Sequence, residues 1–160
     1  MKKVLRLLFF LVLPLGLPAC GEKAPEFVPP DAEESKIMSE GLAADLVKAD
    51  SSDLYSRLDE GFNTVVSKPP EMQKVMEKMF AEYGQPQEYK LRTSQVAQRV
   101  DGPNIRPTRV FWYAVKTTKY PSGKYFLKVE IVKSLYGQHV DVSGFGFLTF
   151  EKTPSFLKER

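Results

Sequence analysis

The chain has little cysteine and little histidine, with one of each among its 160 residues. The single cysteine, Cys20, excludes an intramolecular disulfide, so a hydrophobic core must stabilise the fold without a covalent cross-link. The single histidine, His139, leaves any metal site dependent on carboxylates, and the sequence has no zinc-type spacing of ligands. We therefore expect neither a metal nor a cofactor.

An excess of charge of one sign is lacking too, once the amino terminus is considered separately. The net charge of +3 comes from Lys2, Lys3 and Arg6, because the first 19 residues contain no acidic side chain. Removing these three from the 23 basic side chains leaves 20, against 20 acidic ones. A neutral domain lacks the broad positive field that binding to phosphate backbones requires, so we expect no nucleic-acid partner.

A hydrophobic run long enough to span a membrane is also missing. Residues 7–17 are apolar, but Pro14 and Gly16 interrupt this stretch, which is already shorter than the ~20 residues of a transmembrane helix. The basic side chains before the stretch and the small Ala19 after it are typical of a cleaved export signal. The sequence therefore predicts a signal peptide over residues 1–19.

The residues that close the apolar stretch, Leu17-Pro18-Ala19-Cys20, resemble a lipobox, the bacterial signal for attaching lipid to a cysteine. The resemblance implies cleavage before Cys20, a diacylglycerol on its thiol and a further acyl chain on its amino group. Several acyl chains together give a stable membrane anchor, which a single chain does not. The alternatives are an ordinary secretory signal with an incidental cysteine, and an uncleaved membrane anchor.

The residues that follow the cysteine bear on location. Residue 21 is Gly21 rather than aspartate, which in the enterobacterial sorting rule resembles a lipoprotein destined for the outer membrane. The resemblance thus implies a lipid-anchored, periplasm-facing protein of the cell envelope, at the outer rather than the inner membrane. Residues 20–31 would form the lipidated cysteine and a tether that Pro25, Pro29 and Pro30 make semi-extended.

Helices are predicted in the first half of the remaining chain. Apolar residues at three- and four-residue spacing predict an amphipathic helix over residues 32–49, and Asp31 with Glu34 has the spacing of a capping box. A short second helix follows a break rich in serine and aspartate. A third helix is expected over residues 70–83, with Gly84 as its stop signal.

Strands are predicted in the second half, over residues 87–100, 108–119, 124–135 and 139–151. The third alternates most clearly, and a turn-rich loop is expected over residues 101–107. Helices first and strands after indicate an α+β domain over residues 32–152, with N-terminal helices packed on a curved four-stranded antiparallel sheet. Residues 153–160 are expected to form a loose tail, although Phe156 and Leu157 could pack back.

This pattern is similar to the cystatin-like, nuclear-transport-factor-2-like fold, and within it to small exported domains of unknown function. The resemblance implies a curved sheet wrapped over helices, often with a pocket between them. That fold hosts isomerases, dehydratases, binding modules and structural partners, so it does not choose among functions. Four segments carry the resemblance: Phe80-Ala81-Glu82-Tyr83-Gly84, Phe111-Trp112-Tyr113, Lys128-Val129-Glu130-Ile131-Val132-Lys133 and Gly137-Gln138-His139-Val140-Asp141-Val142-Ser143-Gly144-Phe145.

Candidate site residues are few, and none is assigned a catalytic role. His139 and Asp141 would share a strand face and, with Tyr113 nearby in a pocket, could provide a general base. The alternative is an exposed histidine at the start of a strand. Several aromatic side chains could line a ligand pocket or contact a partner, or could pack in the core: Trp112, Tyr113, Phe145 and Phe147.

Two further patterns leave alternatives open. If Phe145 and Phe147 face away from Val142, both faces of the sheet are partly apolar, and a partner or a second copy could cover the outer face. Ordinary core packing is the other explanation. A set of methionines on the helices also has two explanations. They could form an adaptable surface for an apolar ligand, or they could pack in the core: Met38, Met72, Met76 and Met79.

These observations predict a non-enzymatic interaction or binding module, attached to the membrane through lipid on Cys20, with an envelope protein or a second copy as partner. One alternative is a carrier or sensor of a small apolar ligand, which requires an open pocket of about 300 Å³ or more between helices and sheet. A less favoured alternative is a pocket isomerase or hydrolase using His139. It requires His139, Asp141 and Tyr113 to converge inside a pocket.

Overall fold

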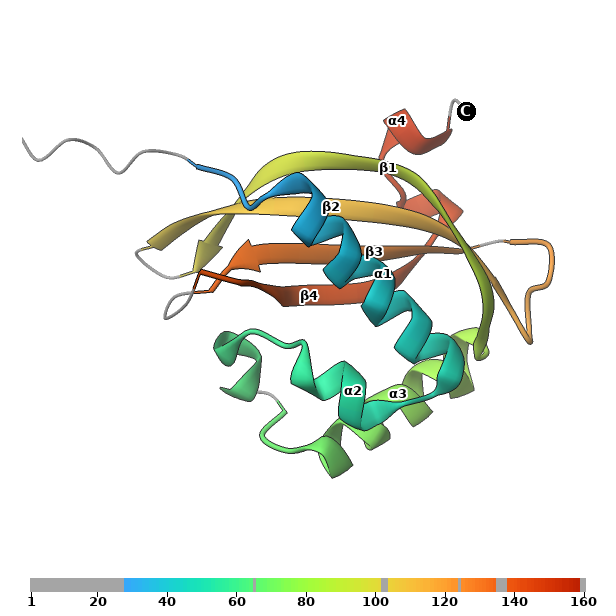
Figure 1. Ribbon diagram of the computed structural model, residues 1–160. Coiled ribbons are helices and arrows are strands. Elements are labelled where there is room, and N and C mark those ends of the chain that lie inside the picture. The colour runs from blue at the N-terminus through green and yellow to red at the C-terminus, as the bar shows by residue number, and fades with distance from the viewer. Residues whose placement is uncertain (1–27, 65, 102–103, 124, 135–137, 159–160) are drawn as a thin grey trace, which may run out of the picture.

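The computed structural model describes residues 28–64, 66–101, 104–123, 125–134 and 138–158 (Figure 1). The predicted signal peptide, the lipobox-like segment with Cys20 and most of the tether lie outside the described residues. So does Leu135, which was expected to continue the alternation of the third strand.

Helices occupy the first half of the described chain, as the sequence predicts. They are α1 (Ala32–Lys48), α2 (Ser51–Ser56), the 3₁₀ helix η1 (Glu60–Thr64) and α3 (Pro69–Tyr83). The Asp31 carboxylate caps α1 by accepting hydrogen bonds from the backbone N–H groups of Glu33 and Glu34, both at 2.9 Å. No helix among the described residues is long and apolar enough to cross a membrane.

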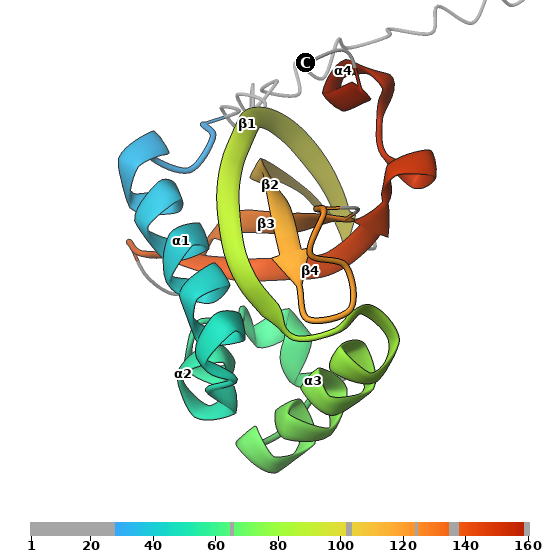
Figure 2. The same cartoon turned by 90° about the vertical axis from the view of Figure 1, so that its right-hand side faces the viewer.

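The second half forms one open antiparallel sheet whose strands follow the order β1-β2-β3-β4. The strands are β1 (Pro86–Asp101), β2 (Asn104–Thr117), β3 (Tyr125–Lys133) and β4 (Val140–Thr149). The α+β class with a four-stranded antiparallel sheet is therefore confirmed. β1 is long and arches over the rest of the sheet (Figure 2).

The predicted loop over residues 101–107 is wrong, because its described residues, 101 and 104–107, take part in strand pairing. Asp101 pairs with Asn104, and Pro107 lies within β2 opposite Gln98. A proline is tolerated there because β2 pairs with β3 only from Thr108 onward, so at residue 107 β2 has one strand neighbour.

The helices cover one face of the sheet, and the space between the two layers is filled by side chains. Leu42 and Leu46 from α1, Met72 and Met76 from α3, and several sheet residues are no more than 1% exposed. The methionines Met72 and Met76 are thus core residues. The Tyr113 hydroxyl lies 2.6 Å from the Ser39 hydroxyl in this core, and burial raises the pKa of Tyr113 to about 12.

One extra residue in β4 decides which way its aromatic side chains point. Ile131 pairs with Val142, but Glu130 pairs with Gly144, so Ser143 is the additional residue of a β-bulge. The bulge shifts the alternation by one, and both Phe145 and Phe147 therefore face the helices, as Val142 does. The alternative in which these two phenylalanines face away from Val142 is wrong.

The last residues return to the sheet on the face opposite α1. The chain forms a 3₁₀ helix η2 (Phe150–Lys152) and a short helix α4 (Ser155–Lys158) after β4. Leu157 is 7% exposed and packs with Val110, Trp112 and Phe126 in a second, smaller apolar cluster. Figure 2 places α1 and α4 on opposite sides of the sheet.

Gly84 ends α3 in a backbone conformation that only glycine adopts readily, with φ 82° and ψ 156°. A Cβ here would lie 2.7 Å from the backbone nitrogen of Lys119. We expect Gly84→Ala to lower the free energy of unfolding by about 2–3 kcal/mol in urea denaturation. The matched control is Gly146→Ala, whose Cβ would meet nothing within 4 Å; equal losses in the two variants would contradict this account.

Candidate functional site

The outer face of the sheet, opposite the helices α1 to α3, carries a large hollow among the described residues. Cross-strand pairing arranges the residues of this face in rows. One row contains Gln95, Val110 and Glu130, and the next contains Trp112, Lys128 and Gly146. Successive side chains of β2 point to opposite faces of the sheet. Val110 and Trp112 therefore point outward, while Phe111 and Tyr113 point into the core.

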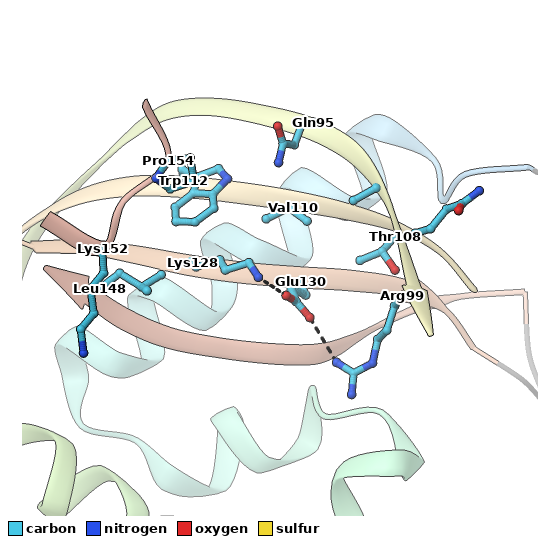
Figure 3. A pocket seen from close by; sticks show the side chains of 12 residues that line it. Gln95, Arg99, Thr108, Val110, Trp112, Lys128, Glu130, Leu148, Lys152 and Pro154 are labelled. Carbon is cyan, nitrogen blue, oxygen red and sulfur yellow. Dashed lines mark hydrogen bonds and ion pairs between the residues drawn. The ribbon is translucent and has the colours of Figure 1, made fainter. Parts of the chain in front are cut away.

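Two hollows on this face share lining residues, and we call them together the outer-face groove; Figure 3 shows the side chains around the larger one. The larger has a volume of about 500 Å³ and lies between β1, β2, β3 and the returning C-terminal segment. The smaller has a volume of about 290 Å³ and lies over β3 and β4. The two share Lys128, Glu130 and Leu148, so they adjoin each other.

Apolar and polar side chains line the larger hollow from different sides. Leu148 and the largely buried Val110 and Trp112, which are 4% and 3% exposed, form the apolar wall, whereas Gln95 and Lys152 supply hydrogen-bonding groups at the edge. The volume is within the range of small-ligand sites, which combine apolar walls with a few placed polar groups. It would equally accept one or two side chains of a protein partner.

Glu130 is the electrostatic centre of the groove. Its carboxylate accepts a hydrogen bond from Arg99 at 3.1 Å and forms an ion pair with Lys128. Arg99 also donates to the backbone carbonyl of Ser143 at 2.6 Å. Lys128 Nζ lies 5.8 Å from the centre of the Trp112 ring, within cation–π distance.

The balance of charge in the larger hollow favours anionic groups. Three basic side chains, Arg99, Lys128 and Lys152, face a single acidic one, Glu130. The ion pairs fix Arg99 and Lys128 in place, so a ligand would meet an ordered rather than a flexible basic edge. A ligand or partner segment with an apolar part and a carboxylate or similar anion fits this chemistry best.

Glycines in β4 make room for this network. A Cβ on Gly144 would lie 2.9 Å from Glu130 Oε2, so a larger residue would displace the carboxylate. Gly146 lies beside Lys128 and has open space where a Cβ would be. The absence of side chains at these two positions creates the smaller hollow.

The aromatic candidates from the sequence separate into two groups. Trp112 lines the outer-face groove. Tyr113, Phe145 and Phe147 lie on the opposite face among the core residues under the helices. The residues that the sequence did not single out include Arg99, Glu130 and Lys152, which come from three elements and have no common local motif.

The candidate base pair lies away from the groove. His139 Nε2 is 3.4 Å from the Asp141 carboxylate, and the His139 side chain is 63% exposed just before β4. Tyr113 is buried in the core under α1, where its hydroxyl contacts Ser39. The three side chains therefore do not converge in a pocket, which is the arrangement that the isomerase or hydrolase alternative requires.

Burial raises the pKa of the Asp141 carboxyl, and a hydrogen bond from Ser134 and the neighbouring His139 oppose the rise. A carboxyl with a raised pKa in the folded state stabilises the fold most when it is protonated, at low pH. That contribution is lost as the pH rises through the folded-state pKa. We therefore expect the free energy of unfolding of Asp141→Asn, measured by urea denaturation relative to wild type, to increase as the pH rises from 3 to 7. A pH-independent difference would contradict the shift.

The chemistry available on the outer face is recognition through shape, apolar contact and charge. Among the described residues, no cluster of histidine, cysteine, aspartate and glutamate side chains could hold a metal ion.

Compared with protein-family models, with curated proteins and with solved structures, the chain matches none of them.

Proposed function

We propose that this protein is a lipoprotein of the cell envelope, attached through lipid on Cys20, whose folded domain is a non-enzymatic binding module. The N-terminal pattern supports the anchor: a basic start, a short apolar stretch and a lipobox-like Leu17-Pro18-Ala19-Cys20. We also assign the fold to the cystatin-like group. Three N-terminal helices, four sequential antiparallel strands and the arch of β1 support this assignment.

The observation that carries the binding function is the contrast between the two faces of the sheet. The helix-covered face is filled by side chains that are almost completely buried. The outer face keeps an open groove although apolar residues line it, and the returning C-terminal segment covers only part of that face. A hollow with an apolar wall and ordered charges at its edge is typical of a ligand or interaction site.

The anchor is tested by the intact mass of the protein extracted from membranes of its own host. We expect a chain that begins at Cys20 and carries a diacylglycerol and an additional acyl chain. The Cys20→Ala variant is the control and should appear without lipid in the soluble fraction. An unmodified wild-type chain, or one that keeps residues 1–19, would refute the anchor.

The binding function is tested by native mass spectrometry of the gently extracted, anchored protein. We expect an additional bound mass. The space between helices and sheet, where the carrier alternative required its pocket, is filled by side chains. A small organic mass would therefore identify a carrier whose ligand lies in the larger hollow of the outer face, which has a volume of about 500 Å³. A protein mass would identify the interaction module. A bare chain under conditions that preserve other envelope complexes would count against both.

A further inference from the structure

Exposed apolar side chains concentrate at one end of the molecule. Those that the structure describes as large and exposed are Val28, Ile37, Val96, Val100 and Ile105. Val28 and Ile37 flank the start of α1, and the other three lie on the β1–β2 hairpin. Around the turn between β2 and β3, at the other end of the sheet, the exposed residues are mainly polar, such as Lys119 and Ser122.

The three hairpin residues lie on one face of the β1–β2 hairpin, with the Gln98–Pro107 pair between Val96 and the other two. Val100 pairs directly with Ile105 across the two strands, and the two side chains are 70% and 61% exposed. Val96 is 45% exposed and points to the same face as Val100, four residues along β1. We call these three residues the hairpin patch. The hairpin extends past β3, because β2 pairs with β3 only from Thr108 onward.

The hairpin patch lies beside the point where the N-terminal tether joins the domain. Arg109, the cross-strand partner of Val96, donates from Nε to the backbone carbonyl of Pro30 at 2.6 Å. Figure 1 shows the start of α1 on the same side of the molecule as the end of β1 and the start of β2. The tether therefore joins the domain beside Val96, at one end of the patch.

We propose that the hairpin patch inserts into the surface of the membrane to which Cys20 is attached. The inference rests on the proposed lipid anchor. In the semi-extended form expected from its prolines, a tether of ten residues reaches about 31 Å at most, and the four residues from Arg109 to Ile105 span about 13 Å of strand. Cys20 and the hairpin patch can therefore reach the same bilayer surface. Anchoring makes the contact intramolecular, so three aliphatic side chains suffice.

The composition of the patch favours lipid over a protein surface. Valine is under-represented at the energetic centres of protein interfaces, where tryptophan, tyrosine and arginine dominate. A stable dimer buries about 1,200–2,000 Å² in total, far more than two facing copies of three aliphatic side chains offer. Apolar side chains that enter the boundary between headgroups and acyl chains need no shaped partner.

The experiment uses the full lipidated protein in vesicles of phosphatidylethanolamine and phosphatidylglycerol that carry a nitroxide on their acyl chains. Lipid occupies the Cys20 thiol, so Val100→Cys introduces the only free thiol for an environment-sensitive fluorophore. Ser122→Cys, in the exposed turn between β2 and β3, is the matched control. We expect quenching at position 100 to exceed that at position 122 by at least about threefold.

A second variant separates insertion of the hairpin from insertion of the fluorophore itself. Adding Val96→Ser and Ile105→Ser to the labelled Val100→Cys chain should reduce its quenching to the level of the Ser122→Cys control. Equal quenching at positions 100 and 122 in floating protein would overturn the hairpin inference and leave the anchor intact. Self-quenching at position 100 without lipid quenching would mean that a second copy covers the patch, and would also overturn it. Failure of the protein to float with the vesicles would reject the anchor, and the inference with it.

Discussion

Arg106→Met is expected to lower the free energy of unfolding by about 3–5 kcal/mol, the cost of leaving a buried charge without its partner. Arg106 donates to both carboxylate oxygens of Asp59, at 2.8 and 3.3 Å, and to the backbone carbonyl of Lys133 at 2.6 Å. The two side chains are only 11% and 7% exposed. Methionine keeps much of the side-chain volume but leaves the Asp59 carboxylate in a site that water reaches poorly.

The pair matters because it holds a segment against the edge of the sheet. The backbone N–H of Asp59 donates to the carbonyl of Val142 at 2.8 Å, and Leu58 forms a parallel bridge with Val142 in β4. This segment satisfies part of the β4 edge, which would otherwise be available for pairing with other chains. We therefore expect Arg106→Met to aggregate more readily as well.

Urea denaturation of the mature chain measures the effect of Arg106→Met. The control is Arg92→Met, which changes an exposed arginine on β1 and should cost no more than about 0.5 kcal/mol. The double variant Asp59→Asn with Arg106→Met removes both charges and should recover part of the loss. The account of the pair is wrong if Arg106→Met and Arg92→Met cost the same.

Gln95→Trp is expected to reduce binding at the outer-face groove by at least about tenfold, equivalent to about 1.4 kcal/mol. Gln95 is exposed, and it lines the larger hollow from β1. An indole at this position would occupy volume that a ligand or partner needs. The fold should tolerate the change because the side chain starts at the surface.

The neighbouring residue provides the control. Ser94 is also exposed, but it pairs with Phe111 and so points to the other face of β1. Ser94→Trp should leave binding unchanged, because it adds the same side chain outside the groove. The readout is the fraction of protein that carries the bound mass in native mass spectrometry. Equal losses in Ser94→Trp and Gln95→Trp would move the binding site away from the groove.

Local features of the fold could be predicted from the sequence. The cap at Asp31 and the end of α3 at Gly84 depend on residues a few positions apart, and both are confirmed. The side-chain alternation of β3 is confirmed over residues 127–131 for the same reason. Residues 101–107 could not be predicted in this way. Their glycine and prolines indicate a loop, but pairing between β1 and β2 extends the strands almost to the turn.

The outer-face groove could not be predicted, because its parts are distant in the sequence. Arg99 and Glu130 are 31 residues apart, and Lys152 reaches the groove only because the C-terminal segment folds back. The bulge at Ser143 has no clear local signal, yet it decides that Phe145 and Phe147 belong to the core. Trp112 was singled out for its chemistry, but its strand face follows from the register with β3.

The most direct test of the binding module is photocrosslinking in living cells from inside the groove. A benzophenone-bearing amino acid would replace Lys152, which is exposed and lines the larger hollow, or Glu77, which is exposed on α3 as the control. The account predicts a discrete adduct, to a protein or to a small molecule, from position 152 and none from position 77. An adduct from position 77 alone, or none from position 152 in protein shown to be membrane-anchored, would contradict it.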